Sequence, residues 1–148
     1  MLAEVTALFE RLLAELPPGT AALNVYTVPR NGGTVIELKP TNRAAADLGV
    51  HCDESHVFSF GFGPAQWELP HERRYRHDEK DILTEIEEMS RAVIAGDCEV
   101  SGRRFSLTGR IYVGDYTYEV RELHWFPQRA RFSTRHYAPY VQSDPTAL

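Results

Sequence analysis

The densest group of reactive side chains is the segment HCDESH at residues 51–56. Thiolate, imidazole and carboxylate groups bind transition metals such as zinc, and a cysteine beside a histidine base can act as a nucleophile. Contiguous residues rarely bind one ion together, and the chain has no C-x-x-C or H-E-x-x-H spacing. We therefore interpret the segment as a polar loop and expect no metal. The alternative is a metal or catalytic site formed by His51, Cys52, Glu54 and His56.

A second candidate is the segment HERRYRH at residues 71–77, which combines arginine, histidine and an aromatic ring close to Trp67. Arginine matches phosphate and carboxylate groups, so this mixture suits an anionic ligand or a nucleic-acid backbone. The net charge of −5 argues against nucleic acid, because phosphate binding needs a positive surface. We interpret the segment as a solvated connection. If it contacts a partner, the candidate residues are Trp67, His71, Arg73, Arg74, Tyr75 and Arg76.

The C-terminal segment RARFSTRHYAPY at residues 129–140 interleaves arginines with aromatic rings. Such rings can stack on nucleic-acid bases. In an acidic chain we instead expect them to pack back onto the body of the domain.

Signatures of common enzymes and cofactor sites are missing from the sequence. No G-x-S-x-G, P-loop, EF-hand loop or kinase element occurs, and GFGP at residues 61–64 lacks the spacing of a dinucleotide fingerprint. We therefore expect no cofactor, and an enzyme is the less favoured class.

The composition fits one domain, with 148 residues of which 43% are hydrophobic. We expect this domain to span residues 1–140, followed by a frayed tail at residues 141–148. The sequence has no apolar run of membrane-spanning length and no basic-then-apolar leader, so we expect a cytoplasmic protein. Its two cysteines are too few for a disulfide scaffold, and we expect free thiols.

Residues 104–122 predict a β-hairpin, whose register follows from a two-residue turn at Gly114 and Asp115. One face is then apolar, with the cross-strand pairs Val113–Tyr116, Ile111–Tyr118 and Gly109–Val120. The other face is polar, with the pairs Tyr112–Thr117, Arg110–Glu119 and Thr108–Arg121.

Two amphipathic helices can cover such an apolar face. The first is predicted over residues 2–16 and ends at Pro17, because its apolar side chains recur at helical spacing. The second carries an apolar face formed by Ile82, Leu83, Ile86, Met89, Val93 and Ile94. We expect Asp78 to cap its start and Gly96 its end. Its water-facing residues are predicted to be Glu85, Glu87, Glu88 and Arg91.

Further strands are predicted at residues 22–28, 34–38, 57–62 and 98–100, with a short edge segment at residues 67–69. In the strand at residues 57–62, Phe58, Phe60 and Phe62 are expected on one face. Residues 40–56 give no firm assignment. Together the elements predict an α+β fold, an antiparallel or mixed sheet of five to six strands with two helices packed on one face.

These features predict a small non-catalytic protein that binds another macromolecule, a protein in preference to nucleic acid or a membrane. Its acidic charge would suit a basic partner, as an inhibitor or immunity-type protein needs. One alternative is a small enzyme or metal-binding protein with its site at residues 51–56, assisted by His71 or His77. Another is a small-ligand module with a pocket between the sheet and its helices. The sequence leaves the partner's identity and the oligomeric state open.

Overall fold

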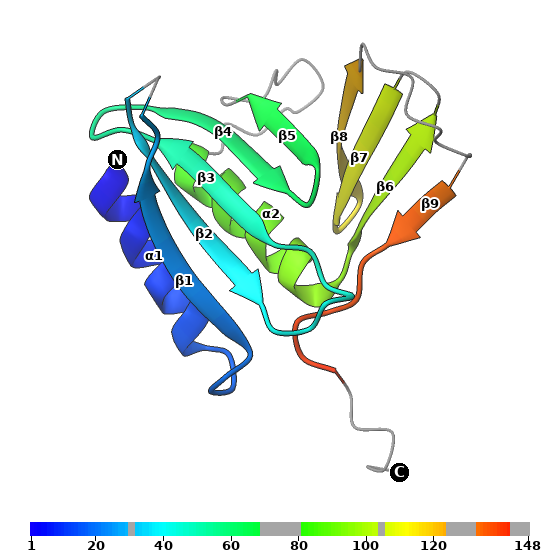
Figure 1. Ribbon diagram of the computed structural model, residues 1–148, viewed down its shortest axis with the longest axis horizontal. Coiled ribbons are helices and arrows are strands. Elements are labelled where there is room, and N and C mark those ends of the chain that lie inside the picture. Colours follow the sequence, from blue (N-terminus) through cyan, green and yellow to red (C-terminus); the bar gives the residue numbers. More distant parts are fainter. Residues whose placement is uncertain (30–31, 69–80, 104–105, 124–132, 143–148) are drawn as a thin grey trace.

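The computed structural model describes residues 1–29, 32–68, 81–103, 106–123 and 133–142, whose arrangement Figure 1 shows. This part of the chain is mostly strand, with two helices. In chain order the elements are α1 (Leu2–Ala14), β1 (Ala21–Thr27), β2 (Thr34–Pro40), β3 (Leu48–Cys52), β4 (Val57–Phe62), β5 (Ala65–Glu68), α2 (Ile82–Ala95), β6 (Cys98–Arg103), β7 (Ser106–Val113), β8 (Tyr116–Leu123) and β9 (Ser133–His136).

The strands form two antiparallel sheets, one of order β1-β2-β3-β4-β5 and one of order β8-β7-β6-β9. The predicted α+β class is confirmed, but the prediction of a single sheet of five to six strands is wrong. Strand patterns do not identify strand partners, and here α2 separates the two groups in the chain. At the junction, the backbone N–H of Gln66 in β5 donates to the Glu122 carboxylate of β8 (3.2 Å). A side chain makes this link between the two sheets.

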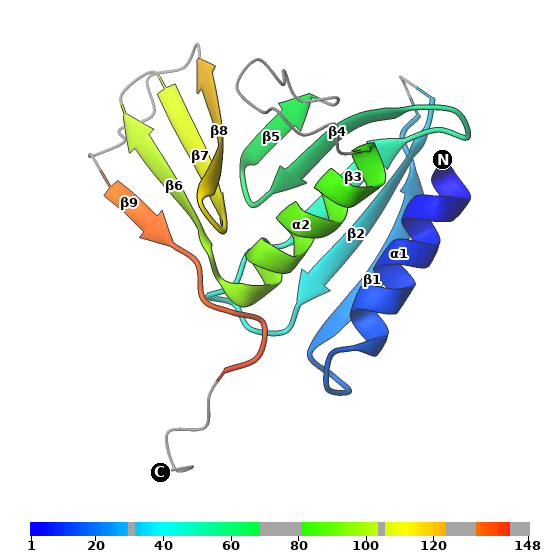
Figure 2. The same cartoon turned by 180° about the vertical axis from the view of Figure 1, so that it is seen from behind.

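The two helices have different neighbours. Helix α1 packs against β1 and β2, whereas α2 contacts β4 of the first sheet and β7 of the second. Seen from both sides in Figures 1 and 2, the helices lie over the same face of the five-stranded sheet. The prediction of two helices on one face of a single sheet is therefore corrected, because α2 is shared between two sheets.

Helix α1 follows its predicted apolar spacing. Val5, Leu8, Phe9 and Leu12 are buried against the five-stranded sheet. Burying an aliphatic or aromatic side chain contributes about 1.5–3 kcal/mol before the ordering cost, so α1 is a core element.

Helix α2 differs from its prediction in two respects. Its N-cap is Asp81, whose carboxylate accepts a hydrogen bond from the Thr84 N–H (2.7 Å), whereas Asp78 lies outside the described residues. Glu85 was expected to face water but is only 1% exposed, because a helix between two sheets is buried on more than one side. The predicted end is confirmed, with Gly96 in the left-handed conformation at φ +82°.

The hairpin of β7 and β8 has the predicted register at every cross-strand pair named from the sequence. Ile111 and Tyr118 are fully buried on its apolar face. On the other face Arg110 donates to Glu119 (2.8 Å), the predicted pair of opposite charges. Gly114 has φ +57°, as a turn with glycine at its first central position requires.

A β-bulge in β4 changes the direction of one ring. His51 pairs with Ser59 while Cys52 pairs with Val57, so Phe58 is the extra residue. Phe60 and Phe62 are buried as predicted, but Phe58 is 41% exposed and its ring lies 5.0 Å from that of His51. The expected face of three phenylalanines is therefore wrong at Phe58.

Strands β3 and β9 lie where the sequence gave no strand assignment. The segment after β9 returns to the core, since Tyr137 and Tyr140 are buried. This confirms the predicted packing of C-terminal rings for those two residues. The boundary between a domain at residues 1–140 and a tail at 141–148 stays a prediction, because residues 143–148 lie outside the described part.

Cys52 and Cys98 are both free and buried, as the sequence predicts. Neither described helix has the length and apolar character needed to cross a membrane. The cytoplasmic location stays a prediction.

Candidate binding groove

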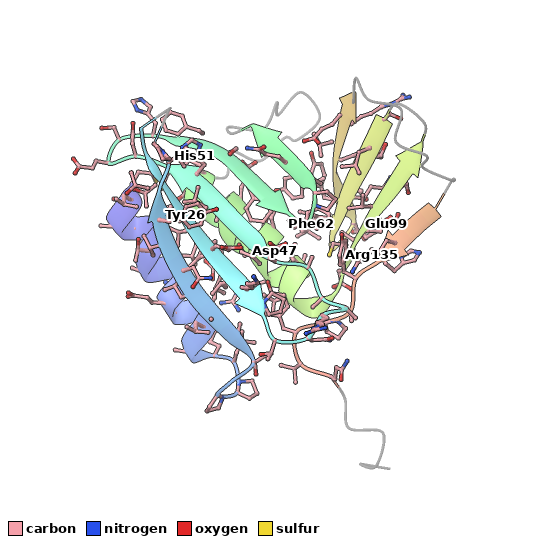
Figure 3. All side chains as sticks on the ribbon, in the orientation of Figure 1. Tyr26, Asp47, His51, Phe62, Glu99 and Arg135 are labelled. Atoms are coloured by element: carbon pink, nitrogen blue, oxygen red, sulfur yellow. The ribbon has the colours of Figure 1, made fainter. Side chains whose placement is uncertain are left out.

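The face of the five-stranded sheet opposite α1 carries two rows of side chains across its strands. Antiparallel register aligns Glu37, Gly49, Gly61 and Gln66 in one row. It aligns Tyr26, Val35, His51 and Ser59 in the next row. Figure 3 shows His51 and Tyr26 toward one end of this face and Asp47 toward the other.

Two glycines hollow the centre of this face. Gly49 of β3 pairs with Gly61 of β4, so two neighbouring strands lack side chains at the same level. The resulting groove has a volume of about 220 Å³. Its walls come from strands β1 to β5 and from the β4–β5 turn, where Gly63 and Pro64 lie.

Steric packing requires a glycine at only one of these two positions. A Cβ on Gly61 would lie 3.0 Å from the Ala65 carbonyl oxygen, so close backbone approach accounts for that glycine. A Cβ on Gly49 would meet nothing nearer than the Ile36 carbonyl oxygen at 3.4 Å, an ordinary contact. Glycine weakens a strand interior and often marks close approach of a ligand or another backbone. At Gly49, packing does not require the glycine, and its effect is to keep the groove open.

Two carboxylates line this groove, Glu37 on β2 and Asp47 just before β3. Among the described residues neither side chain has an ion-pair partner or a hydrogen bond. Some other acids are paired, since Glu15 and Glu87 bind Arg91 at 2.7 and 3.0 Å, whereas Glu10 and Asp115, like the groove acids, have no partner among the described residues. The groove therefore presents two carboxylates without an ion-pair partner among the described residues, and Lys39 lies two residues from Glu37 on the same face of β2.

The end of the groove near the β1–β2 turn is built around His51. Its Nε2 lies 3.3 Å from the Gly32 carbonyl oxygen, and its ring packs beside the bulged Phe58. A Cβ on Gly33 would lie 3.0 Å from the same Nε2, so the turn fits closely around the imidazole. This packing fixes the ring at the groove's edge.

The wall on the β5 side is a hydrogen-bonded pair. The side-chain NH2 of Gln66 donates to the Ser59 hydroxyl (2.7 Å). The side-chain carbonyl oxygen of Gln66 then serves as an acceptor at the groove. On the opposite wall Tyr26 of β1 is 51% exposed, so the groove lining also includes an aromatic ring.

The polar face of the second sheet contrasts with this groove. There Glu99 accepts a hydrogen bond from the Tyr112 hydroxyl and lies within ion-pair distance of Arg110 (3.5 Å) and His136 (3.1 Å). The bond to Glu99 raises the pKa of Tyr112. Both Glu99 oxygens have partners on the same sheet, so this cluster ties strands β6, β7 and β9 together.

The structure separates the residues of the segment 51–56. His51 lies on the groove face, while Cys52 is fully buried on the opposite face, where burial raises the pKa of its thiol. The strand ends at Cys52, and Asp53 accepts hydrogen bonds from the backbone N–H groups of Ser55 and His56 (2.7 and 2.6 Å).

The interpretation of the segment as a loop holds only for residues 53–56, because His51 and Cys52 are paired residues of strand β3. Glu54 and His56 are exposed in the turn. The described residues hold no cluster of three or more histidine, cysteine or acidic side chains arranged for a metal. A protonated thiol that faces the core is also poorly placed to act as a nucleophile.

The predicted partner-binding residues lie mostly outside the described part. His71, Arg73, Arg74, Tyr75 and Arg76, and also His77, fall within residues 69–80. Trp67 occupies a position in β5 opposite Phe60. Their role as partner contacts stays a prediction.

The groove residues Glu37, Asp47 and Gly49 are not among the candidates predicted from the sequence. They are spread over two strands and a turn and form no local motif, so only the register brings them together. The available signal was Gly49, a glycine beside the apolar Leu48 and Val50. The small-ligand pocket expected between sheet and helices stays a prediction, and this groove lies on the face of the sheet opposite the helices.

Comparison with known proteins adds no identity. No family model matches the chain, and neither a curated protein nor a solved structure is significantly similar to it.

Proposed function

We propose that this protein is a non-catalytic binding protein that takes a basic segment of a partner protein into the groove of its five-stranded sheet. The observation that carries the proposal is Gly49, which keeps the centre of the groove open without a packing need. An inhibitor or immunity-type role would be one form of such binding.

Charge supports a basic partner. Glu37 and Asp47 both line the groove without an ion-pair partner among the described residues, in a chain of net charge −5. An acidic surface attracts a cationic partner over a distance and pairs with its lysine or arginine side chains on contact. The exposed ring of Tyr26 adds a surface on which a cation can pack.

The volume of the groove favours a side chain of a partner protein as its occupant over a free small molecule. Typical small-molecule sites have volumes of roughly 300–1,000 Å³ and enclose most of the ligand. The groove holds about 220 Å³ and is open along the sheet, which fits one or two side chains of an extended segment.

The experiment is a selection of peptides from a random displayed library on the purified protein, followed by affinity measurements on the winners. We expect lysine and arginine to be enriched. Gly49→Val should lower the affinity by at least about tenfold, because its side chain fills the groove while the strand accepts it. Glu37→Gln should lower affinity and weaken its dependence on salt.

Asp115→Asn is the matched control, since Asp115 is an exposed acid in the β7–β8 turn, outside the groove lining. It changes the net charge by the same amount and should leave the affinity nearly unchanged. Neutral or acidic winners, or basic winners that bind Gly49→Val as tightly as the parent, would show that the proposal is wrong.

A further inference from the structure

Among the described residues, strand β1 forms an edge of the five-stranded sheet, and its own sequence lacks the usual protection of edges. Natural edge strands carry lysine, proline or a bulge that prevents another strand from pairing. The residues of β1, AALNVYT, include none of these, and its pairing with β2 is regular throughout. At the opposite edge, by contrast, the Glu122 carboxylate occupies a β5 backbone N–H.

The hydrogen bonds that flank β1 show which of its backbone groups point outward. Thr41 N–H donates to the Thr20 carbonyl at one end, and Val28 N–H donates to the Gly33 carbonyl at the other. In an antiparallel pair, bonded and non-bonded residues alternate. Even-numbered residues of β1 therefore bond to β2. The residues whose N–H and C=O groups point away from the sheet are Ala21, Leu23, Val25 and Thr27.

A second copy of the strand can use every one of these outward groups. If two β1 strands pair antiparallel about a twofold axis at Asn24, Val25 lies opposite the partner subunit's Leu23, and Thr27 opposite the partner subunit's Ala21. Each of these pairs joins two outward residues, so each exchanges two hydrogen bonds. A two-residue shift in register would leave outward groups at the ends unpaired.

The side chains also suit a second copy. Asn24 would lie opposite the partner subunit's Asn24. The large ring of Tyr26 would lie opposite the partner subunit's Ala22, whose side chain is small. The strand has no charged residue, so no like charges face each other. Val25 and Tyr26, which are 54% and 51% exposed, would gain cover.

We infer that β1 is a homodimer interface that joins two five-stranded sheets into one continuous sheet about an axis at Asn24. Because that axis is perpendicular to the sheet, both binding grooves face the same side. Tyr26 lines the groove and stands two strands from the hollow at Gly49, so dimer formation completes its outer wall with the partner subunit's Ala22.

The test is the mass of the full-length chain in solution across a dilution series, by light scattering and native mass spectrometry. We expect a dimer for the parent. Asn24→Lys places two like charges at the axis and should raise the dimer dissociation constant by at least about tenfold. Asn24→Asp should do the same, and an equal mixture of the two variants should form mixed dimers. Melting temperatures verify that each variant folds.

A second pair of variants tests the register through the backbone. Val25→Pro removes an N–H that points outward and leaves the ladder with β2 intact, so it should give a folded monomer. Val25→Thr keeps that N–H and should remain a dimer. A monomeric parent, or a dimer that both Asn24→Lys and Val25→Pro leave unchanged, overturns the inference. Glu37, Asp47 and Gly49 lie within one chain, so peptide affinity, measured separately, distinguishes failure of the dimer from failure of the groove.

Discussion

Gly49 and Gly61 are paired on neighbouring strands. Only at Gly61 does close packing exclude a side chain. We predict that Gly49→Ala raises the free energy of unfolding by about 0.4–1 kcal/mol, because alanine restricts the unfolded chain and fits the strand. Gly61→Ala should lower it, since the new Cβ would lie 3.0 Å from a backbone carbonyl. Urea denaturation measures both. Equal shifts in the two variants would contradict the steric distinction on which the groove depends.

Ser90 of α2 is fully buried, and within the described residues its hydroxyl has no hydrogen-bond partner. Ser90→Ala removes an unsatisfied polar group and improves helix propensity, so we expect the free energy of unfolding to rise by about 1 kcal/mol. Ser59 is buried too, but its hydroxyl accepts a bond from Gln66. Ser59→Ala should therefore be destabilising. Thermal unfolding of the two variants should move in opposite directions.

For single residues, the sequence shows which reactive side chains are present but not where the fold places them. The segment 51–56 holds the densest reactive side chains, but the turn at Asp53 and the inward direction of Cys52 disperse them. Glu37 and Asp47 look unremarkable in the sequence because each is one acid among many. Their proximity depends on strand register, which no local pattern specifies.

The N-cap of α2 permits a prediction about an element. Asp81 accepts the Thr84 N–H at 2.7 Å, so Asp81→Ala should lower the free energy of unfolding by about 1 kcal/mol. Asp115→Ala, at an exposed turn, should change the free energy of unfolding by less than about 0.5 kcal/mol. Chemical denaturation of both variants is the measurement. Similar losses for the two would mean that Asp81 does not act as a cap.

Elements with strong local signals were predictable. The β7–β8 register followed from one turn and from alternation, and α1 followed from the spacing of its apolar residues. Strand β3 is short, and although Leu48, Val50 and Cys52 alternate with Gly49 and His51, polar and turn-favouring residues flank it on both sides and hide its bounds. Strand β9 was missed because its four residues are polar and stabilised chiefly by pairing with β6.

For the molecule as a whole, the division into two sheets was beyond the sequence. Each strand's pattern shows which face is apolar but not which sheet it joins. The burial of Glu85 has the same origin, since an acidic residue on a helix is expected in water until a second sheet covers it. Long-range arrangement, and not local propensity, determines both features.

The buried core predicts alkaline instability. Burial raises the pKa of Cys98 from 9.0 to about 12, and it also raises the pKa of Tyr140. The folded state therefore holds these protons more tightly than the unfolded chain, and its stability falls as pH rises. We expect the contribution to be complete below about pH 9 and to be lost progressively toward pH 12.

Urea denaturation under reducing conditions across this pH range measures the effect. Tyr140→Phe should be less stable at neutral pH, because the hydroxyl bonds to the Leu38 carbonyl (3.3 Å), but should lose less stability at high pH. A parent profile that stays flat to pH 11 would contradict the burial of ionisable groups described for the core.

Binding of a basic segment of another protein in the groove of the five-stranded sheet can be observed directly. The most direct measurement is a map of amide chemical-shift changes as a selected basic peptide is titrated into the isotope-labelled protein. We predict that the largest changes fall at Glu37, Asp47, Gly49, Gly61 and Gln66 and disappear with Gly49→Val. Changes centred on Glu99 and Arg110 of the second sheet, and unaffected by Gly49→Val, would contradict the account.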